Sequence, residues 1–154
     1  MTAHRMEVTG SCHCGAITFE ATIDPAQVIA CHCRDCQAFS GAPLQAVVPT
    51  PVGQVTLRGT PREYVKVAAS GNRRALGFCE TCGTQLFATE ADGPRKELNL
   101  RLGCIAERGR LAPVVQIWGE SCVPWLSRLA ALPIHARGLS SPLMTERGGV
   151  PDAG

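Results

Sequence analysis

The chain has 154 residues, of which 45% are hydrophobic and 18% charged, and its formal net charge is +2. This length and apolar content suffice for one domain with a buried core, and the near-neutral charge argues against a nucleic-acid partner because no broad positive field is available to hold a phosphate backbone. No segment approaches the roughly 18 apolar residues of a membrane span, and the first ten residues lack the apolar run of a secretory signal. We therefore expect a cytoplasmic protein with no membrane association.

Short strands separated by turns dominate the elements predicted along the chain. Apolar residues alternate most clearly from Ile17 to Ile23, which is the pattern of a half-buried strand. Weaker alternation predicts further strands at residues 44–48, 55–57, 64–68, 76–78 and 98–102. Pro-Thr-Pro at 49–51 and Ala-Asp-Gly-Pro at 91–94 are predicted turns. The sequence therefore predicts a mainly β fold.

Two short stretches are predicted to be helical, residues 34–39 and residues 124–132, with Ser121 as a candidate N-cap of the second. Residues 1–137 are expected to form the domain. Residues 138–154 are rich in Gly, Pro and Ser and have few large apolar side chains, so we expect them to form a disordered C-terminal tail.

The nine cysteines are the strongest signal in the sequence. In a reducing cytoplasm they are not expected to form disulfides, so metal binding is the leading interpretation. Seven of them fall into three tight groups, Cys12-His13-Cys14, Cys31-His32-Cys33-Arg34-Asp35-Cys36 and Cys79-Glu80-Thr81-Cys82-Gly83. In an extended strand, residues two apart point to the same face, so both members of a Cys-x-Cys pair can reach one ion. The Cys-x-x-Cys-Gly group is typical of a tight knuckle that supplies half a zinc site.

Thiolate ligands favour zinc, with an iron–sulfur cluster as the alternative. Four thiolates close a structural tetrahedron, whereas three leave a position open to water or substrate, as catalytic zinc sites do. The three cysteines at 31–36 lie close enough in sequence to hold one ion by themselves, which leaves the two remote pairs to join across the fold. We expect two zinc ions per chain, one structural and one catalytic or exchangeable. The expected structural ligands are Cys12, Cys14, Cys79 and Cys82, and the expected catalytic ligands are Cys31, Cys33 and Cys36.

Other polar and aromatic residues have weaker claims to a role. Isolated Cys104 and Cys122 are interpreted as small buried hydrophobic residues. His13 and His32 each lie between two ligand cysteines, so their rings are expected to point away from the metal. The remaining candidates are Arg34 and Arg74, as partners for the negative charge of the cluster or for substrate carboxylates, and Phe39, Trp118 and Trp125, interpreted first as core residues.

The order and spacing of these motifs resemble the glutathione-dependent formaldehyde-activating enzyme family, also called the centromere protein V domain family. The resemblance runs from about Thr9 to Leu132 and implies a β-tent fold of layered antiparallel sheets around the zinc sites, with the same division of the cysteines. Gln116 departs from the commoner family pattern, in which a His often precedes Ile-Trp. The motifs that carry the resemblance are Gly10-Ser11-Cys12-His13-Cys14-Gly15, Cys31-His32-Cys33-Arg34-Asp35-Cys36, Ser40-Gly41-Ala42-Pro43, Phe78-Cys79-Glu80-Thr81-Cys82-Gly83-Thr84, Ile117-Trp118 and Pro124-Trp125-Leu126.

The resemblance also implies an activity. Family members are carbon–sulfur lyases that reversibly join formaldehyde to glutathione, so the expected partners are a small thiol such as glutathione and a small aldehyde. One alternative is a non-catalytic, zinc-stabilised binding module for a protein partner. The other is a thiol redox switch in which Cys33 and Cys36 form a disulfide when zinc leaves.

Overall fold

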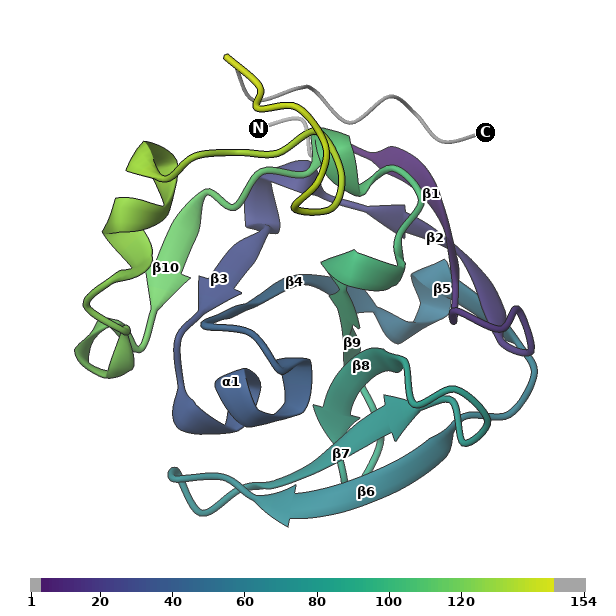
Figure 1. The fold of residues 1–154 in the computed structure, drawn as a ribbon. Helices are drawn as coiled ribbons and strands as arrows, with labels where there is room; N and C mark the ends of the chain where they lie inside the picture. Colours follow the sequence, from purple (N-terminus) through teal and green to yellow (C-terminus); the bar gives the residue numbers. More distant parts are fainter. Residues whose placement is uncertain (1–3, 146–154) are drawn as a thin grey trace.

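The computed structural model describes residues 4–145, which form two β-sheets with short helices around them (Figure 1). The strands are β1 (Met6–Ser11), β2 (Thr18–Ile23), β3 (Ile29–Cys31), β4 (Gln45–Pro51), β5 (Val55–Arg58), β6 (Arg62–Val67), β7 (Arg73–Phe78), β8 (Gln85–Glu90), β9 (Glu97–Arg101) and β10 (Val115–Ile117). The α-helix is α1 (Arg34–Ser40), and 3-10 helices span Pro25–Gln27, Val52–Gln54, Leu102–Cys104, Arg108–Arg110, Gly119–Ser121 and Leu126–Ala131. No helix in this part of the chain is long and apolar enough to span a membrane.

The two sheets differ in size. The smaller has the strand order β1-β2-β5 and is antiparallel throughout. The larger has the order β10-β3-β4-β9-β8-β7-β6, and its pairs are antiparallel except for β10, which runs parallel to β3. The parallel pair brings a segment about 85 residues further along the chain to the side of the first metal-binding strand.

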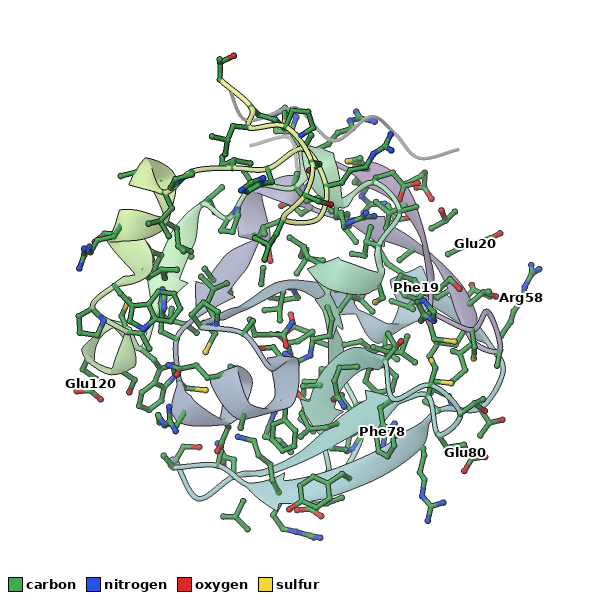
Figure 2. The ribbon with its side chains drawn as sticks, in the orientation of Figure 1. Phe19, Glu20, Arg58, Phe78, Glu80 and Glu120 are labelled. Carbon is green, nitrogen blue, oxygen red and sulfur yellow. The ribbon has the colours of Figure 1, made fainter. Side chains whose placement is uncertain are left out.

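The hydrophobic core lies between the two sheets. Strand alternation directs Val8, Phe19 and Ile23 of the smaller sheet inward, where they pack in one cluster with Val48 and Leu100 of the larger sheet. Figure 2 shows the alternation at β2, where Phe19 points into the molecule and its neighbour Glu20 points out to solvent.

The larger sheet has a second, functional face. On β9, Leu98 and Leu100 belong to the core, whereas Asn99 and Arg101 point the other way and line a cavity. On β4, Val48 is in the core and Val47 lines the same cavity. The sheet therefore separates the hydrophobic core from the candidate site.

The expected fold class is confirmed: the protein is mainly β, with layered, largely antiparallel sheets around the cysteine groups and short helices. Each of the predicted strands overlaps an observed one, and α1 matches the helix expected at 34–39. The turn expected at 91–94 also lies between strands, with Gly93 at a φ of 74°.

Two local predictions were wrong. Residues 49–51 form the end of β4, and Pro49 pairs with Asn99. The neighbour on the other side of β4, β3, pairs only as far as Val47, so the proline lies where the strand has an open edge and a missing N–H is tolerated. Ser121 does not cap a helix at 124–132; it ends the 3-10 helix Gly119–Ser121, and the later helix is a 3-10 helix limited to Leu126–Ala131.

The segment expected to be a disordered tail begins with hydrogen-bonded structure. Ser141 closes a turn onto the carbonyl of Gly138, and the Met144 N–H donates to the carbonyl of Ile134. His135 and Leu143 form an isolated β-bridge. The remainder of the predicted tail, residues 146–154, lies outside the described residues.

Candidate metal centres and the adjoining cavity

Four cysteines from two distant turns converge to form what we call the four-cysteine group, Cys12, Cys14, Cys79 and Cys82. The Sγ atom of Cys14 lies 3.6 Å from that of Cys12 and 3.7 Å from that of Cys79, and all four sulfurs lie within 4.8 Å of one another. Four sulfurs about 2.3 Å from a zinc ion form a tetrahedron with edges of about 3.8 Å. The donor set therefore fits a closed tetrahedral metal site.

Two backbone turns place these sulfurs. After β1, the Gly15 N–H donates to the carbonyl of Cys12, and after β7 the Gly83 N–H donates to the carbonyl of Cys79. Gly15 and Gly83 have φ values of 80° and 77°, a left-handed conformation that glycine adopts without steric cost. The His13 N–H donates to the Thr84 hydroxyl, which joins the two turns directly. Cys12 and Cys14 were expected to lie along an extended strand. In the structure they lie in a turn instead.

The surroundings of the four-cysteine group favour the thiolate, the form that binds metal, at Cys12 and Cys82. The Thr84 hydroxyl and backbone N–H lower the pKa of Cys82 to about 5. Burial opposes ionisation of Cys12, yet hydrogen bonds from the Ile17 N–H and from neighbouring thiols lower its pKa. The Ala16 N–H favours the Cys14 thiolate, but the hydrogen bond with Cys12, desolvation by neighbouring atoms and the other thiols raise the pKa of Cys14 to about 11. The thiolate form is therefore favoured at Cys12 and Cys82 and disfavoured at Cys14.

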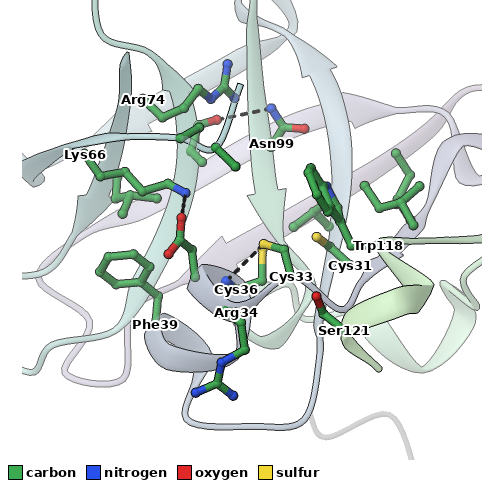
Figure 3. Close-up of a pocket in the computed structure, with 18 of the residues that line it drawn as sticks. Cys31, Cys33, Arg34, Cys36, Phe39, Lys66, Arg74, Asn99, Trp118 and Ser121 are labelled. Carbon is green, nitrogen blue, oxygen red and sulfur yellow. Dashed lines mark hydrogen bonds and ion pairs between the residues drawn. The ribbon is translucent and has the colours of Figure 1, made fainter. Parts of the chain in front are cut away.

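The second cluster, the three-cysteine group, contains Cys31, Cys33 and Cys36, whose sulfurs also lie within 4.8 Å of one another. Cys31 ends β3 and Cys36 lies in the first turn of α1. Cys33 is the N-cap of α1, and its Sγ accepts a 3.3 Å hydrogen bond from the Cys36 N–H. The junction between strand and helix therefore gathers the three sulfurs around one point (Figure 3).

Charge is shared unevenly within the three-cysteine group. A hydrogen bond from the Cys36 thiol lowers the pKa of Cys31 to about 5, and the same interaction raises the pKa of Cys36. Cys31 is consequently the first of the pair to become a thiolate. It is also the more buried, with 7% of its surface exposed.

A cavity of about 470 Å³ opens onto the three-cysteine group. No residue of the four-cysteine group lines this cavity. A small molecule in the cavity can therefore reach the three-cysteine group but not the four-cysteine group. Its apolar wall includes Ile29, Val47, Leu76 and Ile117, contributed by four strands of the larger sheet. A cysteine cluster with three sulfurs and an adjoining cavity has the features of an open metal site.

The charged residues of the cavity wall are mostly cationic. Arg34, Lys66, Arg74 and Arg101 line it, against a single carboxylate, Asp35. Lys66 on β6 forms an ion pair with Asp35 on α1 (Figure 3). This ion pair links the helix to the hairpin formed by β6 and β7. The wall therefore suits a ligand that carries negative charge.

Trp118 borders the cavity beside Cys31 (Figure 3) and has an unusual backbone. Its φ of 58° and ψ of 40° are left-handed, the only such values for a non-glycine residue within 4–145. The preceding residue, Ile117, pairs with Cys31, and its carbonyl accepts from the His32 N–H. The bend at Trp118 thus turns the chain from β10 over the cysteine group.

The predicted candidates separate clearly in the structure. The seven expected ligand cysteines fall into the two expected groups, and neither Cys104 nor Cys122 belongs to either. Arg34, Arg74, Phe39 and Trp118 line the cavity, whereas Trp125 does not. His32 is buried with its ring bonded to Gln116 and takes no part in the three-cysteine group.

The sequence reasoning missed two cations of the cavity wall, Lys66 and Arg101. Arg101 has only 4% of its surface exposed and lines the cavity next to the cysteines. The available signal was a charged residue between Leu100 and Leu102 in a predicted strand, where alternation places it on the face opposite the buried leucines.

The fold is mainly β, and its two cysteine groups could each hold a metal ion, with donor sets consistent with zinc. Residues 7–121 match the glutathione-dependent formaldehyde-activating enzyme family, and the chain belongs to that family. The fold resembles a crystal structure of a Rhodobacter sphaeroides protein from a structural genomics programme, with a TM-score of 0.54, 19% identity, and coverage of 70% of this chain and 98% of that one. No curated protein matches the sequence.

Proposed function

We propose that the protein is a zinc-dependent carbon–sulfur lyase that reversibly joins a thiol such as glutathione to a small aldehyde. Family membership supports a lyase role in general. The single observation that carries the assignment to a site is the cavity, which opens onto the three-cysteine group. Zinc at the four-cysteine group would be structural, and zinc at the three-cysteine group catalytic.

The proposed reaction balances without a further reactant. In the joining direction, a sulfur–carbon bond forms as the carbonyl π bond of the aldehyde breaks, and the proton lost by the thiol ends on the former carbonyl oxygen. When bound by Cys31, Cys33 and Cys36, zinc supplies stabilisation of a thiolate relative to its thiol. No covalent intermediate with the chain is needed.

The chain's own residues supply binding and exclusion of water. Arg34 and Arg74 offer guanidinium groups to substrate carboxylates, which such groups bind in a two-pronged fashion. Lys66 also lines the cavity, where its charge is paired with that of Asp35. The apolar wall formed by Val47 and Leu76 removes water from the reacting atoms, which strengthens electrostatic interactions there.

The decisive experiment measures thiol–aldehyde exchange with zinc-loaded protein, using glutathione and formaldehyde first and then other pairs. Formation of the hydroxymethyl thioether is followed by magnetisation-transfer NMR and compared with the spontaneous rate. The expected rate increases in proportion to protein concentration. Cys33→Ser is expected to abolish the increase while the fold, followed by circular dichroism, persists.

Cys122→Ser is the matched control because Cys122 belongs to neither cysteine group. Its rate should equal that of the unmodified protein. A folded, zinc-loaded protein that accelerates none of the tested pairs would contradict the proposal, as would full activity of the Cys33→Ser variant. Two equally inert zinc ions in such a protein would favour the protein-binding module instead.

A further inference from the structure

Arg101 carries a buried positive charge that no carboxylate neutralises. Only 4% of its surface is exposed, and within residues 4–145 no Asp or Glu oxygen lies within 4.0 Å of its guanidinium. Its Nε atom has no hydrogen-bond partner in the same part of the chain. A charge buried in this way is costly unless another charge nearby offsets it.

Strand register places Arg101 beside the three-cysteine group. Arg101 on β9 pairs with Val47 on β4, and Val47 pairs with Ile29 on β3, two residues before Cys31. All four residues line the cavity, so they share one face of the sheet. Neighbouring strands are about 4.8 Å apart, and the long arginine side chain can therefore extend over Val47 to the sulfurs.

The charges that face the guanidinium are those of the cysteines. Arg101 lines the cavity together with Cys31 and Cys36 and interacts electrostatically with both. The three other cationic residues of the cavity have different surroundings. Lys66 is paired with Asp35, and Arg34 donates to the Gln37 side chain. Arg74 lies opposite Glu90 on β8 and interacts with it electrostatically. Arg101 is thus the buried cation whose charge acts on the three-cysteine group.

The charge count gives Arg101 a definite role. Three thiolates and one divalent ion sum to −1, and a fourth thiolate from a substrate would bring the site to −2. The fixed charge of Arg101 reduces these values to 0 and −1, because an arginine stays protonated in proteins. We propose that Arg101 is a positioning residue that neutralises the three-cysteine metal site, strengthening its hold on the metal and allowing a fourth, anionic ligand to approach. The inference rests on the proposed function only in requiring a metal ion at this group.

The first test compares zinc affinity in Arg101→Met, Arg101→Lys and the unmodified protein by competition with a chromophoric chelator. Removing the charge is expected to weaken the more labile ion by about 10- to 100-fold, the range typical of groups that tune metal ligands. Arg101→Lys should retain most of the affinity. Arg58→Met removes an exposed charge from the smaller sheet and should leave both ions unaffected.

Equal zinc affinities for the Arg101→Met variant and the unmodified protein would overturn the role of Arg101 while leaving the proposed function intact. If the unmodified protein binds no metal at the three-cysteine group, both proposals fail. The two failures are therefore distinguishable.

A second test remains decisive even if Arg101→Met folds poorly. In a variant with Cys31, Cys33 and Cys36 replaced by Ser, Arg101 becomes a buried charge without its counter-charge. Adding Arg101→Met to that variant is expected to raise the melting temperature, whereas the same change in the unmodified protein lowers it. A lower melting temperature in both backgrounds would make Arg101 a purely structural residue and overturn the proposal.

Discussion

The Nε2 atom of His32 donates a 2.8 Å hydrogen bond to the side-chain carbonyl of Gln116. His32 has 1% of its surface exposed, and although it lies between two cysteines of the three-cysteine group, its ring points away from that group. The pair ties β10 to β3, and β10 leads directly to Trp118 at the cavity.

Gln116→Leu should therefore destabilise the protein. The change leaves the buried Nε2–H of His32 without an acceptor, and an unsatisfied buried polar group costs about 1–3 kcal/mol. Urea unfolding curves give the difference. The control is Gln27→Leu, which removes an exposed bond to Asp24 and should change stability by less than about 0.5 kcal/mol. Equal effects of the two variants would show that the hydrogen bond between His32 and Gln116 has no special importance.

The sequence predicted β2 but missed β1, whose burial also alternates but whose six residues include few large apolar side chains. β2 alternates clearly because one face meets the core and the other meets solvent. β8 escaped detection because Leu86, Phe87, Ala88 and Thr89 are all buried, so the strand has no polar face and no period of two. β3 and β10 have three residues each, too few for any periodic pattern.

The candidate site was predicted to the extent that local spacing determines it. The Cys-x-x-Cys-Gly knuckle and the cluster at 31–36 depend on neighbours in sequence, and the structure gathers both as expected. The position of Arg101 depends instead on β9 lying beside β4 in the sheet, a long-range pairing that composition and spacing do not encode. Because this pairing could not be predicted, only Arg34 and Arg74 were expected from the sequence as positive partners for the cysteines.

Cys79→Ser and Cys36→Ser should differ in their effect on the fold. Cys79 is 1% exposed and belongs to the group that joins two turns 65 residues apart, and structural zinc can contribute about 10–16 kcal/mol to folding in small domains. Its loss is expected to unfold the protein. Cys36→Ser should lose one zinc ion and keep the fold. Metal analysis and circular dichroism on both variants check this, and a folded Cys79→Ser protein would contradict the structural role.

Gly10→Ala should destabilise the smaller sheet. Gly10 lies opposite Phe19, and a Cβ atom at Gly10 would be 2.0 Å from the Cζ atom of the ring. The ring is 2% exposed and packed in the core, so overpacking of about 1–3 kcal/mol is expected. Gly53→Ala is the control because no atom lies within 4 Å of the added methyl group. Thermal unfolding should separate the two, and Phe19→Leu should partly rescue the first; absence of rescue would exclude the ring contact as the cause.

Comparing Trp118→Gly with Trp118→Ala separates the two roles of this residue. Both changes remove the indole from the cavity wall, so both should raise the KM for the thiol–aldehyde reaction by the same factor. They differ in backbone cost, because alanine at a φ of 58° retains the steric penalty of the left-handed conformation and glycine does not. The Gly variant should be more stable than the Ala variant by about 1 kcal/mol, measured by urea unfolding. At a site with negative φ, the Ala variant would be the more stable of the two, because glycine makes the unfolded chain more flexible. A more stable Ala variant would therefore mean that residue 118 does not hold the left-handed bend in solution, and the position of the chain over Cys31 would need another explanation.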